Sequence, residues 1–468
     1  MDYKKQIEAY FDQKEDELVA AVSRLASIPS VKGDAAPGAP FGPGPARALD
    51  EALAMAAEMG LTTANHDGYV GSADLNGKDT ILHILGHLDV VGEGSGWTVT
   101  EPFEPKVVDG VLYGRGVADD KGPMAAALLA MKAVRDLNIP LQHNARIIFG
   151  TDEESGMEDV AHYYSTEPYA PYTFSPDADF PVINIEKGFY KPTFTKQWEA
   201  DAALPRLVSF HGGERLNVVP NQAEAVIEGL PMGQLLPRAQ VGAQITGAEF
   251  RVMPQGPDRV KIVALGKSAH AMAPEDGVNA LTALLELLGV LPLAESESKS
   301  AIHALLELLP QKDTRGQGLG IAQSDALSGE LTVAFSLLDM TETGLTGRFD
   351  SRVPLCANDQ NCRQRAEAAF AKHGFTCTGE MTAPHHTPAD SPFVQTLLKC
   401  YEQYTGEKGE CLAIGGGTYV HDIPGGAAFG AAMPGYQTNL HGADEHIPVK
   451  DLLTAAKIYA QVIIDLCS

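Results

Sequence analysis

The sequence comprises 468 residues, of which 44% are hydrophobic and 21% are charged, a composition typical of a globular protein with roughly two to three domains. Its 61 acidic residues outnumber the 35 lysines and arginines, so the formal net charge is −26. This excess argues against nucleic acids and anionic membranes as partners, because both are bound through basic patches. No apolar run approaches the ~20 residues that cross a bilayer, and no basic-then-apolar segment opens the chain, so we expect neither a membrane span nor a signal segment.

The six cysteines all lie in the last quarter or so of the chain, and no two of them form a C-x-x-C pair. This arrangement matches neither a disulfide framework nor a zinc ribbon. It favours reduced thiols in a cytoplasmic protein.

The first part of the chain alternates apolar strands with amphipathic helices. A long helix is expected at residues 3–28, with Ile7, Phe11, Leu18, Val22 and Leu25 on its apolar face, and Pro29 ends it. Further helices are expected at residues 46–59, 123–136 and 157–165, and strands at residues 79–85, 145–150 and 182–186. This alternation predicts a mixed, mostly parallel sheet covered by helices, which binds ligands at the carboxyl ends of its strands.

The pattern changes near residue 187 and returns near residue 385. Between these points lie many short alternating segments, interrupted by expected helices at residues 277–291 and 299–309. Helices at residues 392–405 and 449–466 then close the chain. The sequence therefore predicts an α/β domain built from residues 1–186 and 385–468, interrupted by an inserted α+β domain at residues 187–384.

Polar side chains cluster just after the predicted strands. His87 and Asp89 follow the strand at 79–85, and residues two apart on an extended chain point the same way, so the carboxylate can support a metal-bound imidazole. Asp119 and Asp120 precede an apolar helix in a glycine-flanked loop. Taken alone, this second pair fits either a solvated turn or a cation site.

Three consecutive acids, Asp152 to Glu154, follow the strand at 145–150, and such a group is costly unless it is solvated or faces a cation. Nitrogen and oxygen ligands suit zinc, and also manganese or cobalt, and two ions can be held if one carboxylate bridges them. Glu153 is then the acid that stays off the metals and moves protons. The candidate ligands are His87, Asp119, Glu154, Asp177 and His441. Because they are scattered along the chain, their spacing leaves solvated strand-end loops open as the alternative.

Four blocks in order resemble the co-catalytic metallopeptidases, a family that includes aminoacylases, desuccinylases, glutamate-type carboxypeptidases and dipeptidases. The blocks are residues 86–91 (GHLDVV), 114–122 (GRGVADDKG), 150–156 (GTDEESG) and 175–177 (SPD). Within the family the chain is most similar to PepV-type dipeptidases, through the loop around Trp97 and residues 215–220, 266–280 and 414–419. The resemblance covers essentially the whole chain.

The resemblance implies a dinuclear zinc site, with manganese or cobalt as alternatives. His87 and Asp177 would bind one ion, Glu154 and His441 the other, and Asp119 would bridge them. His446, five residues after His441, is the alternative ligand.

The resemblance also assigns roles around the metals. Asp89 would orient His87, and Glu153 would be the general base that activates a hydroxide bridging the two ions and then protonates the leaving amine. The peptide bond between Asp119 and Asp120 is expected to be cis.

The inserted domain would act as a lid over the substrate. His270 would hydrogen-bond the tetrahedral oxyanion, Arg352 would hold the substrate carboxylate, and Asn217 would lie nearby. Gly416 and Thr418 of the glycine-rich loop would also contact the substrate. An arginine is expected soon after Tyr419 in this family, but the chain has Val420 and His421 there, which leaves the contacts of this loop open.

The other histidines are not interpreted as metal ligands. His385 and His386, near the return from the inserted domain, are interpreted as a solvated hinge. The isolated histidines are interpreted as structural or surface residues: His83, His143, His162, His211, His303 and His373.

The sequence thus predicts a cytoplasmic, metal-dependent dipeptidase that cleaves dipeptides with a free amino terminus. An N-acyl amino-acid deacylase or desuccinylase with the same dinuclear site is the alternative enzyme, and a peptide-binding protein without hydrolytic activity is the alternative class. Since the inserted domain is long enough to supply His270 and Arg352 within one chain, we expect a monomer whose partner is a small peptide substrate.

Overall fold

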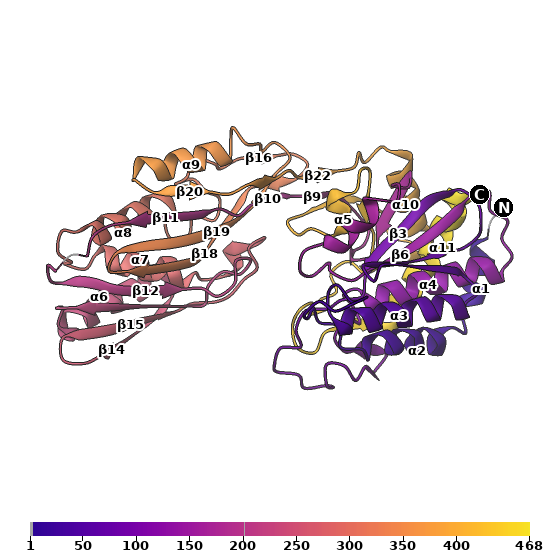
Figure 1. The fold of residues 1–468 in the computed structure, drawn as a ribbon, viewed down its shortest axis with the longest axis horizontal. Coiled ribbons are helices and arrows are strands. Elements are labelled where there is room, and N and C mark those ends of the chain that lie inside the picture. Colours follow the sequence, from indigo (N-terminus) through magenta and orange to yellow (C-terminus); the bar gives the residue numbers. More distant parts are fainter. Residues whose placement is uncertain (1–2, 201) are drawn as a thin grey trace. The chain divides into compact units, whose positions relative to one another are not determined.

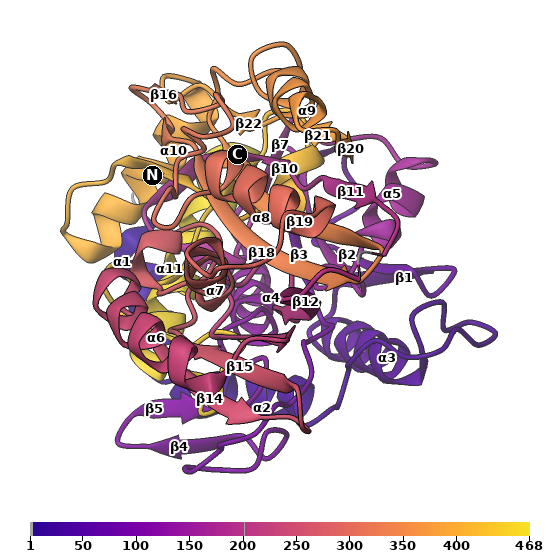
Figure 2. The ribbon, with the colours of Figure 1, turned by 90° about the vertical axis from the view of Figure 1, so that its left-hand side faces the viewer.

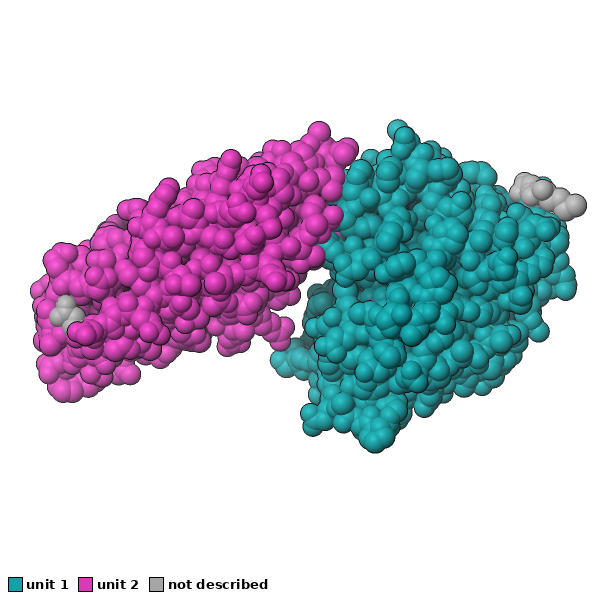
Figure 3. All heavy atoms as spheres, turned by 45° about the horizontal axis from the view of Figure 1, so that its top comes forward, with its two compact units in different colours: residues 1–185, 385–412, 417–468 teal, residues 186–384, 413–416 magenta. Residues whose placement is uncertain are grey.

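A computed structural model describes residues 3–200 and 202–468 (Figure 1). The chain divides into two compact units, which Figure 3 colours separately. Unit 1 consists of residues 1–185, 385–412 and 417–468, and unit 2 of residues 186–384 and 413–416. No helix in the described part of the chain is both long enough and apolar enough to cross a bilayer.

Unit 1 is built on a mixed sheet with a parallel centre. Its strands lie in the order β1, β2, β6, β3, β7, β24, β9 and β22. Strand β3 is parallel to both β6 and β7, β7 is parallel to β24, and β1 and β2 are antiparallel at one edge. The bounds are β1 Thr62–His66, β2 Val70–Asp74, β3 Thr80–His87, β6 Asn144–Gly150, β7 Tyr172–Ser175, β9 Val182–Glu186, β22 His385–His386 and β24 Ala427–Ala428.

Alternate side chains of β3 pack on opposite faces of this sheet, so helices cover both. Leu82 and Ile84 join the large core formed with α4 and α11, whereas Leu85 joins a smaller cluster with α5. The predicted α/β fold is therefore confirmed. The helices of unit 1 are α1 Lys4–Phe11, α2 Glu15–Ala26, α3 Pro43–Glu58, α4 Lys121–Asp136, α5 Glu158–Tyr164, α10 Pro392–Thr405 and α11 Val449–Cys467, with the 3-10 helix η2 at Tyr419–Asp422.

The predicted N-terminal helix is two helices, since α1 ends at Phe11 and α2 begins at Glu15. The apolar residues expected on its buried face are nonetheless buried, because both segments pack against the same core: Ile7, Phe11, Leu18, Val22 and Leu25. Helix α3 begins three residues earlier than expected, at Pro43, since proline is favoured in the first turn.

Unit 1 also contains short strands outside its main sheet. Strands β4 and β5 form a small antiparallel sheet with β26, and β8 pairs with β25. Their bounds are β4 Lys106–Val108, β5 Val111–Tyr113, β8 Ala178–Asp179, β25 Ala431–Ala432 and β26 His446–Pro448. Strand β23, Cys411–Ile414, pairs with β9, and its last two residues belong to unit 2.

Unit 2 is an antiparallel sheet with helices packed against it. The strands lie in the order β14, β15, β13, β12, β18, β19, β10 and β21, and β11 pairs with β19 and β20. Helix α7 packs against β13, β15 and β18, with α6 and α8 beside it (Figure 2). The strands are β10 Gly188–Tyr190, β11 Thr193–Gln197, β12 Arg206–Gly212, β13 Gln222–Glu228, β14 Glu249–Pro254, β15 Arg259–Leu265, β16 Ser324–Asp325, β17 Gly329–Glu330, β18 Thr332–Thr341, β19 Gly344–Val353, β20 Thr376–Thr378 and β21 Met381–Thr382. The helices are α6 Met232–Thr246, η1 Pro274–Asp276, α7 Ala280–Gly289, α8 Glu297–Leu308 and α9 Arg363–Lys372.

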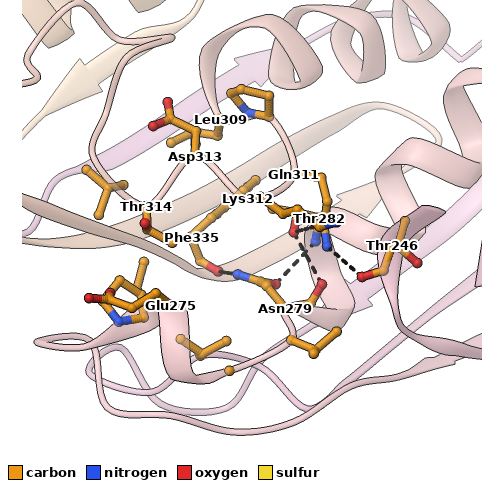
Figure 4. A pocket seen from close by; sticks show the side chains of 17 residues that line it. Thr246, Glu275, Asn279, Thr282, Leu309, Gln311, Lys312, Asp313, Thr314 and Phe335 are labelled. Carbon is orange, nitrogen blue, oxygen red and sulfur yellow. Dashed lines mark hydrogen bonds between the residues drawn. The ribbon is translucent and has the colours of Figure 1, made fainter. Parts of the chain in front are cut away.

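A cavity of about 320 Å³ lies within unit 2, between η1, the start of α7, the end of α8 and strand β18 (Figure 4). Its polar groups pair with one another: Asn279 donates to the Phe335 carbonyl, and Gln311 donates to the Thr246 carbonyl. Among the described residues, none of the predicted metal ligands or catalytic side chains lines it.

Candidate metal centre

Three parallel strands bring the predicted ligands to one edge of the unit 1 sheet. His87 is the last residue of β3, the acidic turn that carries Glu154 follows β6, and Asp177 follows β7. Because these strands are parallel neighbours, their carboxyl ends lie together. Asp119 precedes α4, and His441 lies in the loop before β26.

The five side chains form two groups that share Asp119. His87 Nε2 lies 3.0 Å from Asp119 Oδ1 and 3.6 Å from Asp177 Oδ2. His441 Nε2 lies 3.0 Å from Asp119 Oδ2 and 3.1 Å from Glu154 Oε2. Within each group the ligand atoms lie within 4.8 Å of one another. Each carboxylate oxygen of Asp119 thus faces one histidine.

The carboxylates of this cluster lie close together in a site that is largely closed to solvent. Burial, together with the charge of Asp119, raises the pKa of Asp177 to about 7 and raises that of Glu154. Burial and the charge of Asp177 raise the pKa of Glu153 well above its usual range. Hydrogen bonds to Asp119 and Glu154 raise the pKa of His441 to about 11. The raised pKa values mean that these carboxylates repel one another when all of them are ionised, so bound cations would stabilise their ionised forms.

A divalent ion in each group would offset this repulsion, and neutral imidazole with carboxylate oxygen is a donor set for zinc, manganese or cobalt. One carboxylate with an oxygen toward each group is the arrangement that a two-metal site requires. The residues present therefore fit two divalent ions.

Buried carboxylates hold the backbone of the segments that carry the ligands. Asp89 accepts hydrogen bonds from the amides of Glu153 and Glu154, at 3.2 and 3.1 Å, and its backbone carbonyl lies 3.0 Å from His87 Nδ1. Asp120 accepts from the amide of His87 at 3.1 Å, and its bond to Asp119 is cis, as expected.

Glu445 holds the segment that leads into Asp119. Its Oε1 accepts from the amides of Gly116, Ala118 and Asp119 at 2.9 to 3.2 Å, and its Oε2 lies 2.7 Å from Arg115 Nη1. Both members of this ion pair are buried. One side chain, four residues after His441, thereby ties the His441 loop to Asp119.

His446, the alternative ligand, belongs to neither ligand group in the described residues. Its Nδ1 lies 2.7 Å from the Asp444 carbonyl, and its ring stacks on Tyr113.

Among the other histidines, His385 Nε2 lies 2.9 Å from the Gly426 carbonyl within unit 1. Thr418, also in unit 1, accepts from the Val420 amide at 3.3 Å.

The predicted lid residues belong to unit 2. His270 and Asn217 are exposed and lie on neighbouring segments, since the Asn217 carbonyl accepts from the Ala271 amide at 2.9 Å. Arg352 is buried and forms a fork with Asp350, through Nε at 2.7 Å and Nη2 at 3.0 Å, while Nη1 donates to Gly415, next to Gly416.

Sequence reasoning missed three buried groups: Glu445, Asp159 and Tyr419. Asp159 accepts from the amides of Thr151 and Asp152 and from the Tyr419 hydroxyl. The acids read as ordinary surface residues in the sequence. A signal was available for Glu445, because an acid four residues after a predicted ligand can pair with the unexplained Arg115 of the GRG motif.

Comparison with known proteins decides the family. The model for peptidase family M20/M25/M40 matches residues 83–465. This chain belongs to that family. The predicted resemblance to co-catalytic metallopeptidases is confirmed.

Similar proteins cover nearly the whole length of this M20 chain. A Bacillus subtilis protein named "Putative dipeptidase YtjP" is 37% identical over 465 residues, covering 97% of this chain and 98% of its own. A Staphylococcus aureus protein named "Putative dipeptidase SAR1836" is 33% identical over 471 residues, with the same coverage.

Solved structures share the M20 fold at low identity. Human carnosine dipeptidase 1 superposes with a TM-score of 0.57 and 17% identity, covering 100% of this chain and 99% of that one. The aminoacylhistidine dipeptidase of Vibrio alginolyticus gives 0.56 and 15%, covering 96% of each chain.

Proposed function

We propose that this M20 protein is a dipeptidase that uses two zinc ions, or manganese or cobalt in their place, to hydrolyse dipeptides with a free amino terminus. The observation that carries the proposal is the position of Asp119, which lies between two histidine–carboxylate groups. The names of the similar full-length proteins support the choice of a dipeptide as substrate.

Two divalent ions held by these side chains would polarise the peptide carbonyl and lower the pKa of water. Glu153 is the acid that is left to move protons, and the raised pKa of its carboxyl group suits that task. It accepts a proton from water as the water oxygen adds to the carbonyl carbon. It then delivers that proton to the amine nitrogen as the carbon–nitrogen bond breaks.

The remaining roles follow the family resemblance. Asp89 orients His87, whose Nδ1 lies 3.5 Å from Asp89 Oδ1, and its carboxylate also accepts from the amides of Glu153 and Glu154. His270 donates a hydrogen bond to the negative charge that develops on the carbonyl oxygen, and Arg352 holds the free carboxylate of the substrate. Asn217, Gly416 and Thr418 are assigned to substrate contacts. In this proposal Asp350 fixes the plane of the Arg352 guanidinium.

The proposal includes a monomeric, cytoplasmic enzyme in which unit 2 completes the site of its own chain. Sedimentation analysis tests the first point, and an obligate dimer would contradict it. Unit 2 is also proposed to limit substrate length, so a tetrapeptide should be a poor substrate.

The deciding assay compares Leu-Leu and Ala-His with N-acetyl and N-succinyl amino acids, using enzyme loaded with zinc. We expect dipeptide hydrolysis that falls by about 10²- to 10⁴-fold in kcat in Glu153→Gln, with both metals retained. Glu158→Gln is the matched control, because Glu158 is exposed five residues away and should leave kcat unchanged. Faster cleavage of the acyl amino acids than of the dipeptides would replace this proposal by a deacylase.

A further inference from the structure

The acidic turn after β6, residues 151–154, is held by two buried carboxylates, Asp159 and Asp89. The amides of Thr151 and Asp152 donate to Asp159 Oδ2, at 2.5 and 3.0 Å. The next two amides, of Glu153 and Glu154, donate to Asp89. Four consecutive backbone N–H groups are thus fixed, and the position of Glu153 depends on both acids.

Asp159 is itself held by Tyr419. The Tyr419 hydroxyl donates to the same Oδ2 atom, and both side chains are buried. Gly150 makes room for this pair, because a Cβ atom at that position would collide with Tyr419 Oη and lie 2.7 Å from Asp159 Oδ2. The Tyr419 ring also lies edge-on to His87, with 6.4 Å between ring centroids. The pair therefore contacts the segments that carry the site, and among the described residues Asp159 belongs to neither ligand group.

Tyr419 is also the first residue of η2 and follows Thr418. Its hydroxyl connects the end of the glycine-rich segment to the acidic turn, two parts of the chain that are 260 residues apart. An Asp159 carboxylate that loses this donor keeps three backbone donors, the amides of Thr151, Asp152 and Val160, but it loses the Tyr419 hydroxyl donor in a buried setting. The turn held by the first two amides can then shift toward better solvation.

We propose that Tyr419 and Asp159 are positioning residues that fix Glu153 for proton transfer. This inference rests on the proposed function, in which Glu153 is the general base. The two residues act on the chemical step through the backbone of the acidic turn. They should therefore affect kcat far more than KM.

The test is Tyr419→Phe, with Tyr459→Phe as the matched control. Tyr459 is equally buried, and its hydroxyl donates to the Phe429 carbonyl at 3.0 Å, outside the acidic turn. Each variant loses one buried hydroxyl and one hydrogen bond, so a purely structural effect should be similar in both. We expect kcat to fall at least about tenfold in Tyr419→Phe with KM nearly unchanged, because a small displacement of a catalytic group can cost up to about 10²-fold. We expect kcat to stay within about twofold of wild type in Tyr459→Phe.

Amide hydrogen exchange of residues 150–156 in the zinc-loaded proteins gives a second measurement that does not depend on activity. Faster exchange there in Tyr419→Phe than in Tyr459→Phe supports the inference. Equal kcat values in the two variants, or equal exchange, would overturn it. If the wild-type protein hydrolyses no dipeptide, the proposed function fails, and the exchange measurement alone then decides whether Tyr419 holds the turn.

Discussion

Replacing Glu445 by glutamine tests whether the metal centre depends on a residue that is not a ligand. Glu445 pairs with Arg115 and accepts three backbone amides, including that of Asp119. Glutamine keeps one oxygen acceptor, but it leaves the Arg115 guanidinium buried without a charged partner. In the described part of the chain, Arg115 otherwise donates to the Gly442 carbonyl at 3.1 Å and the Gly92 carbonyl at 3.4 Å, and neither is charged.

The size of the effect follows from this geometry. Removing one partner of a buried ion pair costs about 3–5 kcal/mol, so we expect the free energy of unfolding of unit 1 to fall by that amount. Since Asp119 and the His441 loop lose their common anchor, metal affinity should also fall by about 10- to 100-fold. Burial raises the pKa of Glu445 to about 7, so the comparison belongs at pH 8, where the pair is ionised.

Unfolding can be followed in unit 1 alone. The chain has two tryptophans. Trp97 belongs to unit 1, where its ring centroid lies 5.5 Å from Arg115 Cζ, and Trp198 belongs to unit 2. In a Trp198→Phe background, denaturant unfolding followed by fluorescence therefore reports on Trp97, and zinc titration reports on affinity. A loss below about 1 kcal/mol, the value for an exposed pair, would refute the reasoning. The double variant Arg115→Met/Glu445→Leu should recover part of the loss, because it removes both buried charges.

Three further outcomes are expected. Chelation should abolish dipeptide hydrolysis and lower the melting temperature, and zinc should restore both; undiminished activity after verified metal removal would contradict the dinuclear site. Burial lowers the pKa of His83 to about 4. The free energy of unfolding should therefore decline as the pH falls from 6.5 toward 4, and this one group should account for about 3 kcal/mol of the decline. Stability curves of wild type and His83→Gln should therefore converge toward acid pH, and parallel curves would refute this assignment. Asp350→Asn should raise KM for dipeptides more than it lowers kcat, because Arg352 loses one of the two carboxylate oxygens that orient its guanidinium; an unchanged KM would count against that role.

The parallel centre of the unit 1 sheet could be predicted because apolar strands and helical stripes are local signals. The sites at strand ends followed from that topology, and His87, the acidic turn and Asp177 do lie at one edge. The break between α1 and α2 was not visible, since the apolar period continues across it and both helices bury the same face.

The hydrogen bonds that hold the ligand-bearing segments in place could not be predicted from the sequence. Glu445 and Asp119 are 326 residues apart, and Tyr419 and Asp159 are 260 apart. Such pairs depend on which buried acid meets which backbone amide, and neither periodicity nor composition encodes that choice. The same holds for Arg352, whose fork with Asp350 lies on a single strand but is invisible as a pattern.

The short segment 413–416 has a consequence for dissecting the molecule. It belongs to unit 2 although the surrounding chain belongs to unit 1, so the polypeptide passes between the units four times, after residues 185, 384, 412 and 416. The Ile414 carbonyl accepts from the Lys187 amide, and the Gly415 carbonyl accepts from Arg352. A fragment of residues 186–384 would lack both acceptors, and its partner fragment would carry an orphaned stretch of chain. Excision of the insert at its two obvious ends would therefore leave each piece incomplete.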